Sequence, residues 1–314
     1  MTGNRDAELS GELHRSAAVS GAWPSAGRRR LRGFRFGLSA LVLGALLGVA
    51  PSVVGQPAPE LVPYIPTSME VVREMLALGR VGAGDVLFDL GSGDGRIPIV
   101  AAQRFGTRGI GFEIVPELIV RSRDAAAAAG VESLVRFVNR DLFTADLSPA
   151  SLVTLYLSPE MNVRLRPKLL RELKAGARVV SHGFHMGDWR PDSVVHVGEG
   201  FGQATVYMWV VPVAIDGFWE LMLETPGGER WYVLEIDQRY QELAGGTLKD
   251  GRSFPLSGGR IRGESLSFSF RDDAGRRPVT YQLTGRMDGT ILHGQVGSFT
   301  GEGPYRWRAT RFRR

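Results

Sequence analysis

The sequence predicts an α/β fold, a doubly wound and largely parallel sheet, followed by a small antiparallel all-β barrel or sandwich. Between residues 67 and 213, short apolar segments alternate with segments of helical periodicity, as in a parallel sheet with helices on both faces. From residue 217 onward no helical period continues beyond about two turns, and short alternating segments recur at about ten-residue spacing. We therefore predict a leader over residues 1–56, an α/β domain over 57–213 and an all-β domain over 214–314.

The α/β domain begins with a proline-rich linker and a helix. Thr67-Ser68-Met69-Glu70 has the pattern of a capping box, with Thr67 as the N-cap, and predicts a helix over residues 68–78. Further helices are expected over residues 97–105, 116–129 and 161–173. Strands are expected over residues 86–90, 109–113, 135–139, 152–157, 177–181 and 204–213.

The all-β domain is divided by turns that contain glycine. Strands are expected over residues 219–224, 231–237, 265–270, 279–284, 290–296 and 306–310. The turns are assigned to Pro226-Gly227-Gly228, Gly245-Gly246, Asp250-Gly251, Gly258-Gly259 and Asp288-Gly289. Short strands with such turns predict a barrel or a sandwich.

Composition excludes several classes of protein. The chain has no cysteine, which excludes disulfides, thiolate zinc sites, iron–sulfur clusters and a cysteine nucleophile. No charge-free apolar run reaches about 20 residues, so a multi-span membrane protein is also excluded. The net charge is +5, but residues 1–56 contain seven Arg and three acids. The rest of the chain is nearly neutral and predicts no nucleic-acid partner.

Residues 1–56 have the pattern of a targeting leader. Five arginines, at positions 28, 29, 30, 32 and 35, precede an apolar stretch over residues 36–49. We expect a cleaved signal peptide, with an uncleaved signal anchor and an organellar transit peptide as alternatives. By the positive-inside rule the body of the protein is exported or membrane-associated through the leader. An organellar or cytoplasm-facing location is the alternative.

A glycine-rich segment joins the first predicted strand of the sheet to the next helix. In Asp89-Leu90-Gly91-Ser92-Gly93-Asp94-Gly95-Arg96, glycine occupies every second position, so the backbone around Ser92 can approach a ligand closely at a helix N-terminus. A dinucleotide fingerprint would need glycine at position 96, where this chain has Arg96. The segment therefore suits a nucleoside with a carboxylate tail better than a pyrophosphate.

Two further carboxylates follow the next two predicted strands. Glu113 lies 24 residues after Asp89 and can accept hydrogen bonds from both hydroxyls of a ribose. Asp141 follows the third strand and can accept from an adenine amino group. Separately, these features have ordinary explanations: a tight turn, a solvated strand end and a helix cap. Together they predict a binding site, because open α/β sheets bind ligands at the carboxyl ends of their strands.

These residues resemble the class I S-adenosylmethionine-dependent methyltransferases, over about residues 67–213. A longer set of segments is similar to bacterial relatives of the ATP synthase c-subunit lysine methyltransferase family. Besides Asp89 to Arg96, the set comprises Pro63-Tyr64-Ile65-Pro66-Thr67, Leu155-Tyr156-Leu157-Ser158-Pro159-Glu160, Arg164-Leu165-Arg166-Pro167-Lys168-Leu169 and Gly176-Ala177-Arg178-Val179-Val180-Ser181.

The resemblance implies a protein-lysine N-methyltransferase with a Rossmann-like sheet and S-adenosyl-L-methionine as its cofactor. The residues expected to hold the cofactor are Asp89, Gly91, Ser92, Gly93, Glu113 and Asp141. Tyr64 and Thr67 are expected to close over its methionine end. The acceptor would be a protein lysine or, in the alternative, a small molecule.

The end of the fourth predicted strand bears on the acceptor. It is followed by Ser158-Pro159-Glu160 rather than by the Asn-Pro-Pro-Tyr or Asp-Pro-Pro-Tyr of amide and many base methyltransferases, which argues against DNA-adenine and glutamine acceptors. Tyr156 and Glu160 are the candidate catalytic residues that favour a neutral lysine, although Glu160 can instead cap a helix. His182 and His185 lie three apart, but without cysteine or nearby acids we predict no metal site.

Two other functions stay open from the sequence. A small-molecule methyltransferase would share the cofactor site and differ only in its acceptor. A non-catalytic binding module on the same scaffold would fit a leader that carries the chain away from the cytosol, where S-adenosyl-L-methionine is made. The sequence leaves open the identity of the acceptor, the degree of methylation, the role of the all-β domain and the oligomeric state.

Overall fold

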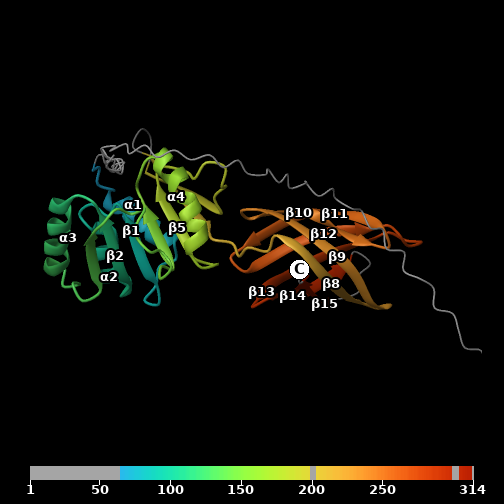
Figure 1. Cartoon of the computed structure of the whole chain (residues 1–314). Coiled ribbons are helices and arrows are strands. Elements are labelled where there is room, and N and C mark those ends of the chain that lie inside the picture. The colour runs from blue at the N-terminus through green and yellow to red at the C-terminus, as the bar shows by residue number, and fades with distance from the viewer. Residues whose placement is uncertain (1–63, 199–202, 299–303, 313–314) are drawn as a thin grey trace, which may run out of the picture. The chain divides into compact units, whose positions relative to one another are not determined.

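The computed structural model describes residues 64–198, 203–298 and 304–312, and the predicted leader lies outside these residues. The described residues form a sheet with covering helices and a closed barrel (Figure 1). The helices are α1 (Met69–Leu78), α2 (Arg96–Phe105), α3 (Pro116–Ala128) and α4 (Pro159–Glu172). The strands of the sheet are β1 (Val86–Leu90), β2 (Arg108–Glu113), β3 (Val135–Asn139), β4 (Leu152–Leu155), β5 (Arg178–His182), β6 (Ser193–Val197) and β7 (Ala204–Val210).

The two faces of the sheet are covered by different helices. Successive side chains of a strand point to opposite faces, so each central strand serves two cores. Leu87 of β1 and Val180 of β5 pack in one core with α1 and α2. Their chain neighbours Phe88 and Val179 pack in the other core with α4. This is the predicted doubly wound arrangement, and it leaves the carboxyl ends of β1, β2, β3 and β4 free to carry a site.

The strand order is β3-β2-β1-β4-β5-β7-β6, and the first five strands are parallel, as predicted. The other edge differs, because β7 pairs antiparallel with both β5 and β6. Strand β6 is absent from the prediction. Of its five residues only Val197 is buried, so the segment carries almost no apolar pattern.

Helix α1 has a different N-cap from the one predicted. Ser68 is the N-cap, and its Oγ accepts a hydrogen bond from the Val71 N–H at 3.3 Å. Thr67 is buried instead, with its Oγ1 3.2 Å from Nδ1 of His182. Two consecutive hydroxyl residues satisfy the capping pattern equally well, so the sequence alone does not select between them.

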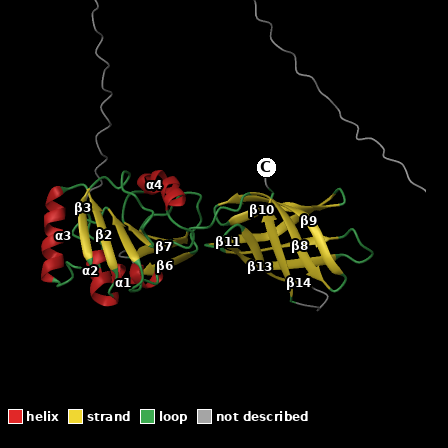
Figure 2. Ribbon diagram, turned by 60° about the horizontal axis from the view of Figure 1, so that its bottom comes forward, coloured by secondary structure: helices red, strands yellow, loops and turns green. Residues whose placement is uncertain are grey.

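The all-β part is a closed barrel rather than a sandwich. Its strands are β8 (Gly217–Thr225), β9 (Gly228–Arg239), β10 (Glu242–Lys249), β11 (Arg252–Arg262), β12 (Ser265–Asp272), β13 (Val279–Asp288), β14 (Ile291–Ser298) and β15 (Tyr305–Arg311). Each strand pairs antiparallel with the next, and β15 pairs with β8 to close the ring (Figure 2). The interior is packed with apolar side chains, including Trp219, Phe270 and Trp307.

Two glycine pairs that the sequence assigns to turns lie inside strands. Gly245-Gly246 belongs to β10 and Gly258-Gly259 belongs to β11, the two barrel strands that the prediction omits. The register of pairing shifts beside both glycine pairs, which marks a β-bulge. A Cβ at Gly245 or at Gly259 would collide with a backbone carbonyl of the neighbouring strand. Glycine is therefore needed there for close strand packing, not for reversing the chain.

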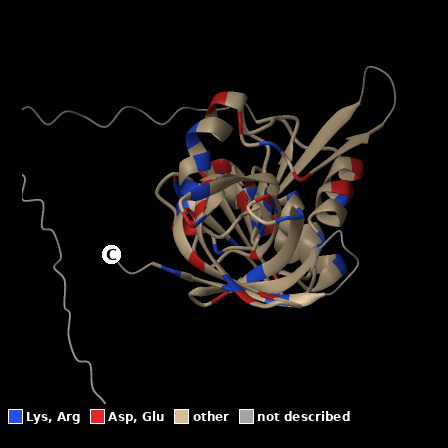
Figure 3. Ribbon diagram, turned by 90° about the vertical axis from the view of Figure 1, so that its right-hand side faces the viewer, with Lys and Arg blue, Asp and Glu red and all other residues tan. Residues whose placement is uncertain are grey.

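Charges of both signs are mixed over the described residues. Figure 3 shows Lys and Arg close to Asp and Glu on the helices and on the barrel strands, in line with the nearly neutral body of the chain. None of the helices in the described part is long and apolar enough to cross a membrane.

The predicted domain boundary near residue 214 falls between the end of β7 and the start of β8. Independent folding of the two parts stays a prediction.

Candidate active site

A cavity of about 560 Å³ lies at the carboxyl ends of β1 to β4. Every residue predicted to bind the cofactor lines it: Tyr64, Thr67, Asp89, Gly91, Ser92, Gly93, Glu113 and Asp141. Tyr156, one of the two predicted catalytic residues, lines it as well. Glu160, the other one, does not. The structure thus brings together side chains that are separated by up to 92 residues in the sequence.

The glycine-rich loop between β1 and α2 is attached to the end of β2. The N–H groups of Gly91 and Ser92 both donate to the Phe112 carbonyl, at 2.9 and 3.0 Å. Gly93 follows with a left-handed backbone (φ 53°), and a Cβ there would lie 2.5 Å from the Tyr64 ring. The loop therefore needs glycine at 93 both for its backbone conformation and for the close approach of Tyr64.

Glu113 is a buried carboxylate that organises this loop. It is 8% exposed. Its Oε2 accepts from the Gly93 N–H at 2.9 Å, and its Oε1 accepts from the N–H groups of Ile114 and Val115 at 2.8 and 3.0 Å. A carboxylate has about four acceptor directions. One is left for a ligand hydroxyl, so accepting from both ribose hydroxyls, as predicted, would require a direction shared with a backbone N–H.

Asp89 is the most deeply buried acid of the site. It is 2% exposed, and its Oδ1 accepts from the Thr154 hydroxyl at 2.7 Å. Burial raises the pKa of Asp89 to about 7; the Thr154 hydrogen bond opposes this shift, and the nearby Glu113 and Asp94 carboxylates add to it. At neutral pH this carboxyl group is thus close to the midpoint of its titration, and a cationic group of a ligand would favour its charged form.

An ion pair that sequence analysis did not anticipate closes one side of the cavity. Arg96 pairs with Asp94 at 2.6 Å and donates to the Thr67 carbonyl, also at 2.6 Å. Burial alone would raise the pKa of Asp94, but the hydrogen bonds and positive charge of Arg96 hold that pKa below its ordinary value. The pair therefore ties the glycine-rich loop to the segment that carries Thr67. In the sequence, the only signal for this ion pair was the spacing of Asp94 and Arg96 within the glycine-rich motif.

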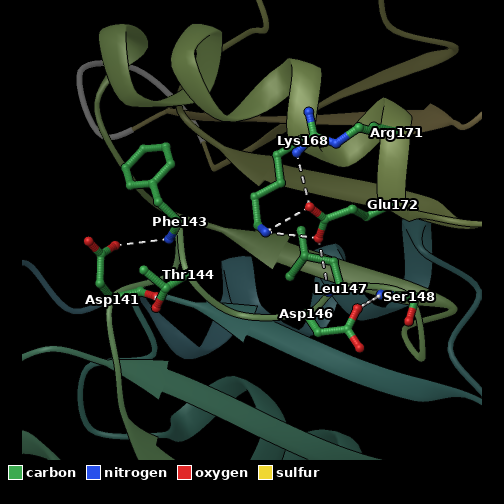
Figure 4. A network of polar contacts seen from close by, with 9 residues as sticks. All are labelled: Asp141, Phe143, Thr144, Asp146, Leu147, Ser148, Lys168, Arg171 and Glu172. Carbon is green, nitrogen blue, oxygen red and sulfur yellow. Dashed lines mark hydrogen bonds and ion pairs between the residues drawn. The ribbon is translucent and has the colours of Figure 1, made fainter.

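Asp141 shapes the loop that follows β3. Its Oδ1 accepts from the Phe143 N–H at 2.9 Å, and Thr144 Oγ1 donates to its carbonyl at 2.8 Å (Figure 4). The loop is also tied to α4, because Glu172 accepts from the Leu147 N–H at 3.3 Å. Phe143 lines the cavity, which sequence analysis did not anticipate because a lone loop aromatic carries no pattern.

The two predicted catalytic residues have different surroundings. Tyr156 follows β4 and faces the cavity beside Leu157 and Met161, two buried apolar residues of its lining. Glu160 lies exposed in the first turn of α4, where its own N–H and the Ser158 side chain hold its pKa below the ordinary value. The Glu160 carboxylate is thus engaged at the helix start, as in the helix-cap alternative.

The two histidines considered for a metal do not act together. His182 contacts Tyr156 and Thr67, whereas exposed His185 accepts from the Gly187 N–H at 3.0 Å. Within residues 64–198, 203–298 and 304–312, no three or more His, Asp or Glu side chains come together as metal ligands.

The residues present fit S-adenosyl-L-methionine. The cavity combines a glycine cradle at a helix N-terminus with a carboxylate at the end of β2. At Gly93 the cradle has no room for a Cβ, so the backbone itself forms this wall, as close approach to a ligand requires. Fold and site together define a class I S-adenosyl-L-methionine-dependent methyltransferase.

Comparison with known proteins gives the family. The family model of the ANTKMT methyltransferase domain matches residues 89–193. A protein-lysine N-methyltransferase of Saccharolobus islandicus is 42% identical over 151 residues, which is 48% of this chain and 94% of that protein. The ATP synthase c-subunit lysine N-methyltransferase of Homo sapiens is 35% identical over 176 residues, 55% of this chain and 74% of that protein. The chain belongs to the ANTKMT methyltransferase family.

A solved structure is similar to about half of the chain. The crystal structure of an RNA methyltransferase from Salinibacter ruber, in complex with S-adenosyl-L-homocysteine, is 51% identical and covers 48% of this chain and 96% of that one, with a TM-score of 0.46. The family match and both curated similarities leave much of the chain uncovered, and the family match ends at residue 193, before the first strand of the barrel.

Proposed function

We propose that this protein is a protein-lysine N-methyltransferase, which transfers a methyl group in line from S-adenosyl-L-methionine to a desolvated lysine amine of a protein substrate. The observation that carries the proposal is the 42% identity to the Saccharolobus islandicus lysine methyltransferase over 94% of that protein. The family match over residues 89–193 also includes the strand ends that bear Glu113, Asp141 and Tyr156.

The cofactor would be held by the residues that line the cavity. Glu113 and Asp141 offer carboxylate oxygens to the nucleoside, and the glycine-rich loop gives the room for close approach. Tyr64 and Thr67, ahead of α1, cover the methionine end. Bound S-adenosyl-L-methionine would supply an electrophilic methyl group on a sulfonium.

The acceptor wall must favour a neutral amine, because an ammonium ion has no electron pair with which to attack. Leu157 and Met161 provide buried apolar surface beside Tyr156, and such surroundings lower the pKa of an amine. The Tyr156 hydroxyl can both donate and accept, so it can orient the amine toward the methyl group. The chain thus contributes orientation and exclusion of water.

The acceptor class can be tested by following the label from tritiated S-adenosyl-L-methionine. The purified chain is incubated with separate protein, RNA and small-molecule extracts, and the labelled products are hydrolysed and separated. Radioactivity in methyl-lysine supports the proposal. Label only in nucleosides or in small molecules would overturn the lysine acceptor. Cofactor binding without transfer to any extract would favour the non-catalytic module.

The two predicted catalytic residues can be compared in the same assay. Tyr156→Phe removes the hydroxyl of a residue that lines the cavity and should lower kcat about tenfold, the size expected for losing one hydrogen bond of about 1.4 kcal/mol. Glu160→Gln probes the carboxylate that lies outside the cavity wall. A loss as large as that of Tyr156→Phe would assign Glu160 a direct role, and a change below about twofold would leave it as a helix-start residue.

We also propose that residues 1–56 direct the chain to or across a membrane. The support is the order of the arginines and the apolar stretch in the sequence. Residues 1–60 can be fused to a reporter that is active only outside the cytoplasm. Reporter activity supports export or anchoring, whereas activity of a matched cytoplasmic reporter alone would overturn the assignment.

A further inference from the structure

His182 lies beside Tyr156, one of the two predicted catalytic residues, because of the register in which strands β4 and β5 pair. Strands β4 and β5 pair in parallel with Leu155 opposite Ser181, so Tyr156, which follows β4, and His182, the last residue of β5, lie side by side. Their rings stack with centroids 3.9 Å apart and an angle of 30° between the planes. This contact places the imidazole directly against the Tyr156 ring.

The same imidazole contacts a second wall of the cavity. Nδ1 of His182 lies 3.2 Å from Oγ1 of Thr67, a buried residue of the segment ahead of α1. Thr67 and Tyr156 both line the cavity, and His182 lies behind them. One side chain therefore joins two cavity walls that come from segments 89 residues apart.

The backbone around His182 is held on both sides. The buried Asn162 side chain of α4 donates to Ser181 Oγ and to the Phe184 carbonyl, each at 3.1 Å. The Gly183 N–H donates to the Thr205 carbonyl at 2.7 Å. Because its neighbours in the chain are anchored to α4 and β7, the His182 imidazole is held in place beside Tyr156 and Thr67.

We propose that His182 is a positioning residue of the acceptor end of the cavity, which sets Tyr156 and Thr67 in one arrangement for the incoming lysine amine. The proposal rests on the proposed lysine methylation. Burial lowers the pKa of His182, so at neutral pH the ring is uncharged and Nδ1 can accept from the Thr67 hydroxyl. An uncharged ring also avoids repulsion of an arriving ammonium group.

The test is a double-mutant cycle with His182→Phe and Thr67→Val in the full chain. His182→Phe keeps a ring against Tyr156 but loses the nitrogen, and Thr67→Val loses only the hydroxyl. Each single variant should lower kcat for the labelled protein fraction about tenfold, and the double variant should lose no more than either one. His182→Phe should raise the Kd of S-adenosyl-L-homocysteine, measured by calorimetry, by a smaller factor than the factor by which it lowers kcat, because Thr67 also covers the methionine end of the cofactor.

The chain offers a matched control. His196 and Thr205 make the same kind of contact, Nδ1 to Oγ1 at 3.2 Å, but on the exposed faces of β6 and β7 and away from the cavity lining. His196→Phe and Thr205→Val should leave kcat within about twofold of the wild-type value. Equal losses in the control pair and in the His182 pair would overturn the positioning role.

A spectroscopic readout separates this inference from the lysine assignment. The ¹⁵N resonance of His182 Nδ1, assigned by its absence in His182→Phe, should shift in Thr67→Val and stay in place in Thr205→Val. An unmoved resonance, or kcat losses that multiply in the double variant, would overturn the inference. A shifted resonance in a chain that labels no lysine would support the contact and refute the proposed function instead. If His182→Phe does not fold, the resonance is assigned by its absence in His182→Gln, and Thr67→Val then carries the test through the resonance shift and kcat.

Discussion

Buried polar side chains have different roles in the sheet and in the barrel. In the sheet, Asp89 and Glu113 are buried at strand ends that open on one cavity. In the barrel, Tyr232 donates to Asp272 at 2.7 Å, and Asp272 also accepts from the Ala274 N–H at 2.9 Å. An open sheet presents its strand ends to a ligand, whereas a closed barrel pairs its strands and fills its interior. Changes at the cavity of the sheet should therefore alter binding, some of them together with stability, whereas changes in the barrel should alter stability alone.

The largest effect is expected from Gly93→Val, which breaks the cofactor cradle of the sheet. A Cβ at Gly93 would lie 2.5 Å from the Tyr64 ring, and valine is strained at a φ of 53°. We expect calorimetric titration to show a loss of S-adenosyl-L-methionine affinity of about 100-fold or more. Gly84→Val is the control, because a Cβ at Gly84 has open space around it. Normal binding of S-adenosyl-L-methionine by Gly93→Val would show that the glycine-rich loop is not part of the cofactor site.

A pH dependence of stability is the next largest effect, and it belongs to the sheet. The pKa of Asp89 rises from 3.8 to about 7 in the folded chain, chiefly through burial. Between about pH 4 and 7 the folded state therefore holds a proton that the unfolded state has lost. The free energy of unfolding should fall as the pH rises through this range, by at most about 4 kcal/mol, and should level off above it.

Asp89→Asn should remove this slope, as measured by urea unfolding of the ligand-free chain at pH 5 and pH 8. Asp146→Asn serves as the control, since Asp146 is exposed and its pKa is lowered by hydrogen bonds from Ser148. Parallel pH profiles for Asp89→Asn and the wild-type chain would show that Asp89 is already ionised at low pH in the folded state.

A smaller effect, confined to stability, is expected from Tyr232→Phe in the barrel. The variant leaves the buried Asp272 carboxylate without the Tyr232 hydroxyl, which costs about 1–3 kcal/mol of unfolding free energy. Cofactor affinity should not change, because no barrel residue lines the cavity described at the sheet. A change of more than about twofold in the Kd of S-adenosyl-L-methionine would reveal coupling between the two regions.

The smallest effect is expected when the barrel is removed altogether. A chain cut after Val213 keeps the whole cavity lining, so its affinity for S-adenosyl-L-methionine should stay within about threefold of the full chain. Circular dichroism and calorimetry on residues 57–213 check this. A truncated chain that does not fold would show that the sheet depends on the barrel, and the predicted boundary would then not separate two folding units.

The sheet was the more predictable region, because its pattern couples apolar strands to chemistry at their ends. Strand β1, Val86–Leu90, has the predicted bounds, and Asp89, Glu113 and Asp141 line one cavity as expected. Glu160 does not, because Pro159 begins α4 and the first turn directs Glu160 away from the cavity. Spacing along the chain places a residue near a strand end but does not say which way the following helical turn faces.

The barrel was less predictable, because glycine has two uses in β structure. Asp250-Gly251 is a hairpin turn, as predicted, with both residues at positive φ. Gly245 and Gly259 look the same in sequence but lie at bulges inside strands. The burial of Glu113 was also not predictable from the sequence, since a strand-end acid is ordinarily solvated. Its three backbone hydrogen bonds become visible only once the glycine-rich loop folds over it.

The central claim is that Glu113 both organises the glycine-rich loop and binds the cofactor, and Glu113→Ala tests it. Calorimetry should show S-adenosyl-L-methionine binding weakened by about 10- to 100-fold, and urea unfolding should show about 1–3 kcal/mol less stability, because buried N–H groups lose their acceptor. Glu172→Ala is the matched control: Glu172 also accepts a backbone N–H, from Leu147, but lies outside the cavity lining. It should lose stability and keep its affinity. A folded Glu113→Ala protein with an unchanged cofactor Kd would contradict the assigned site.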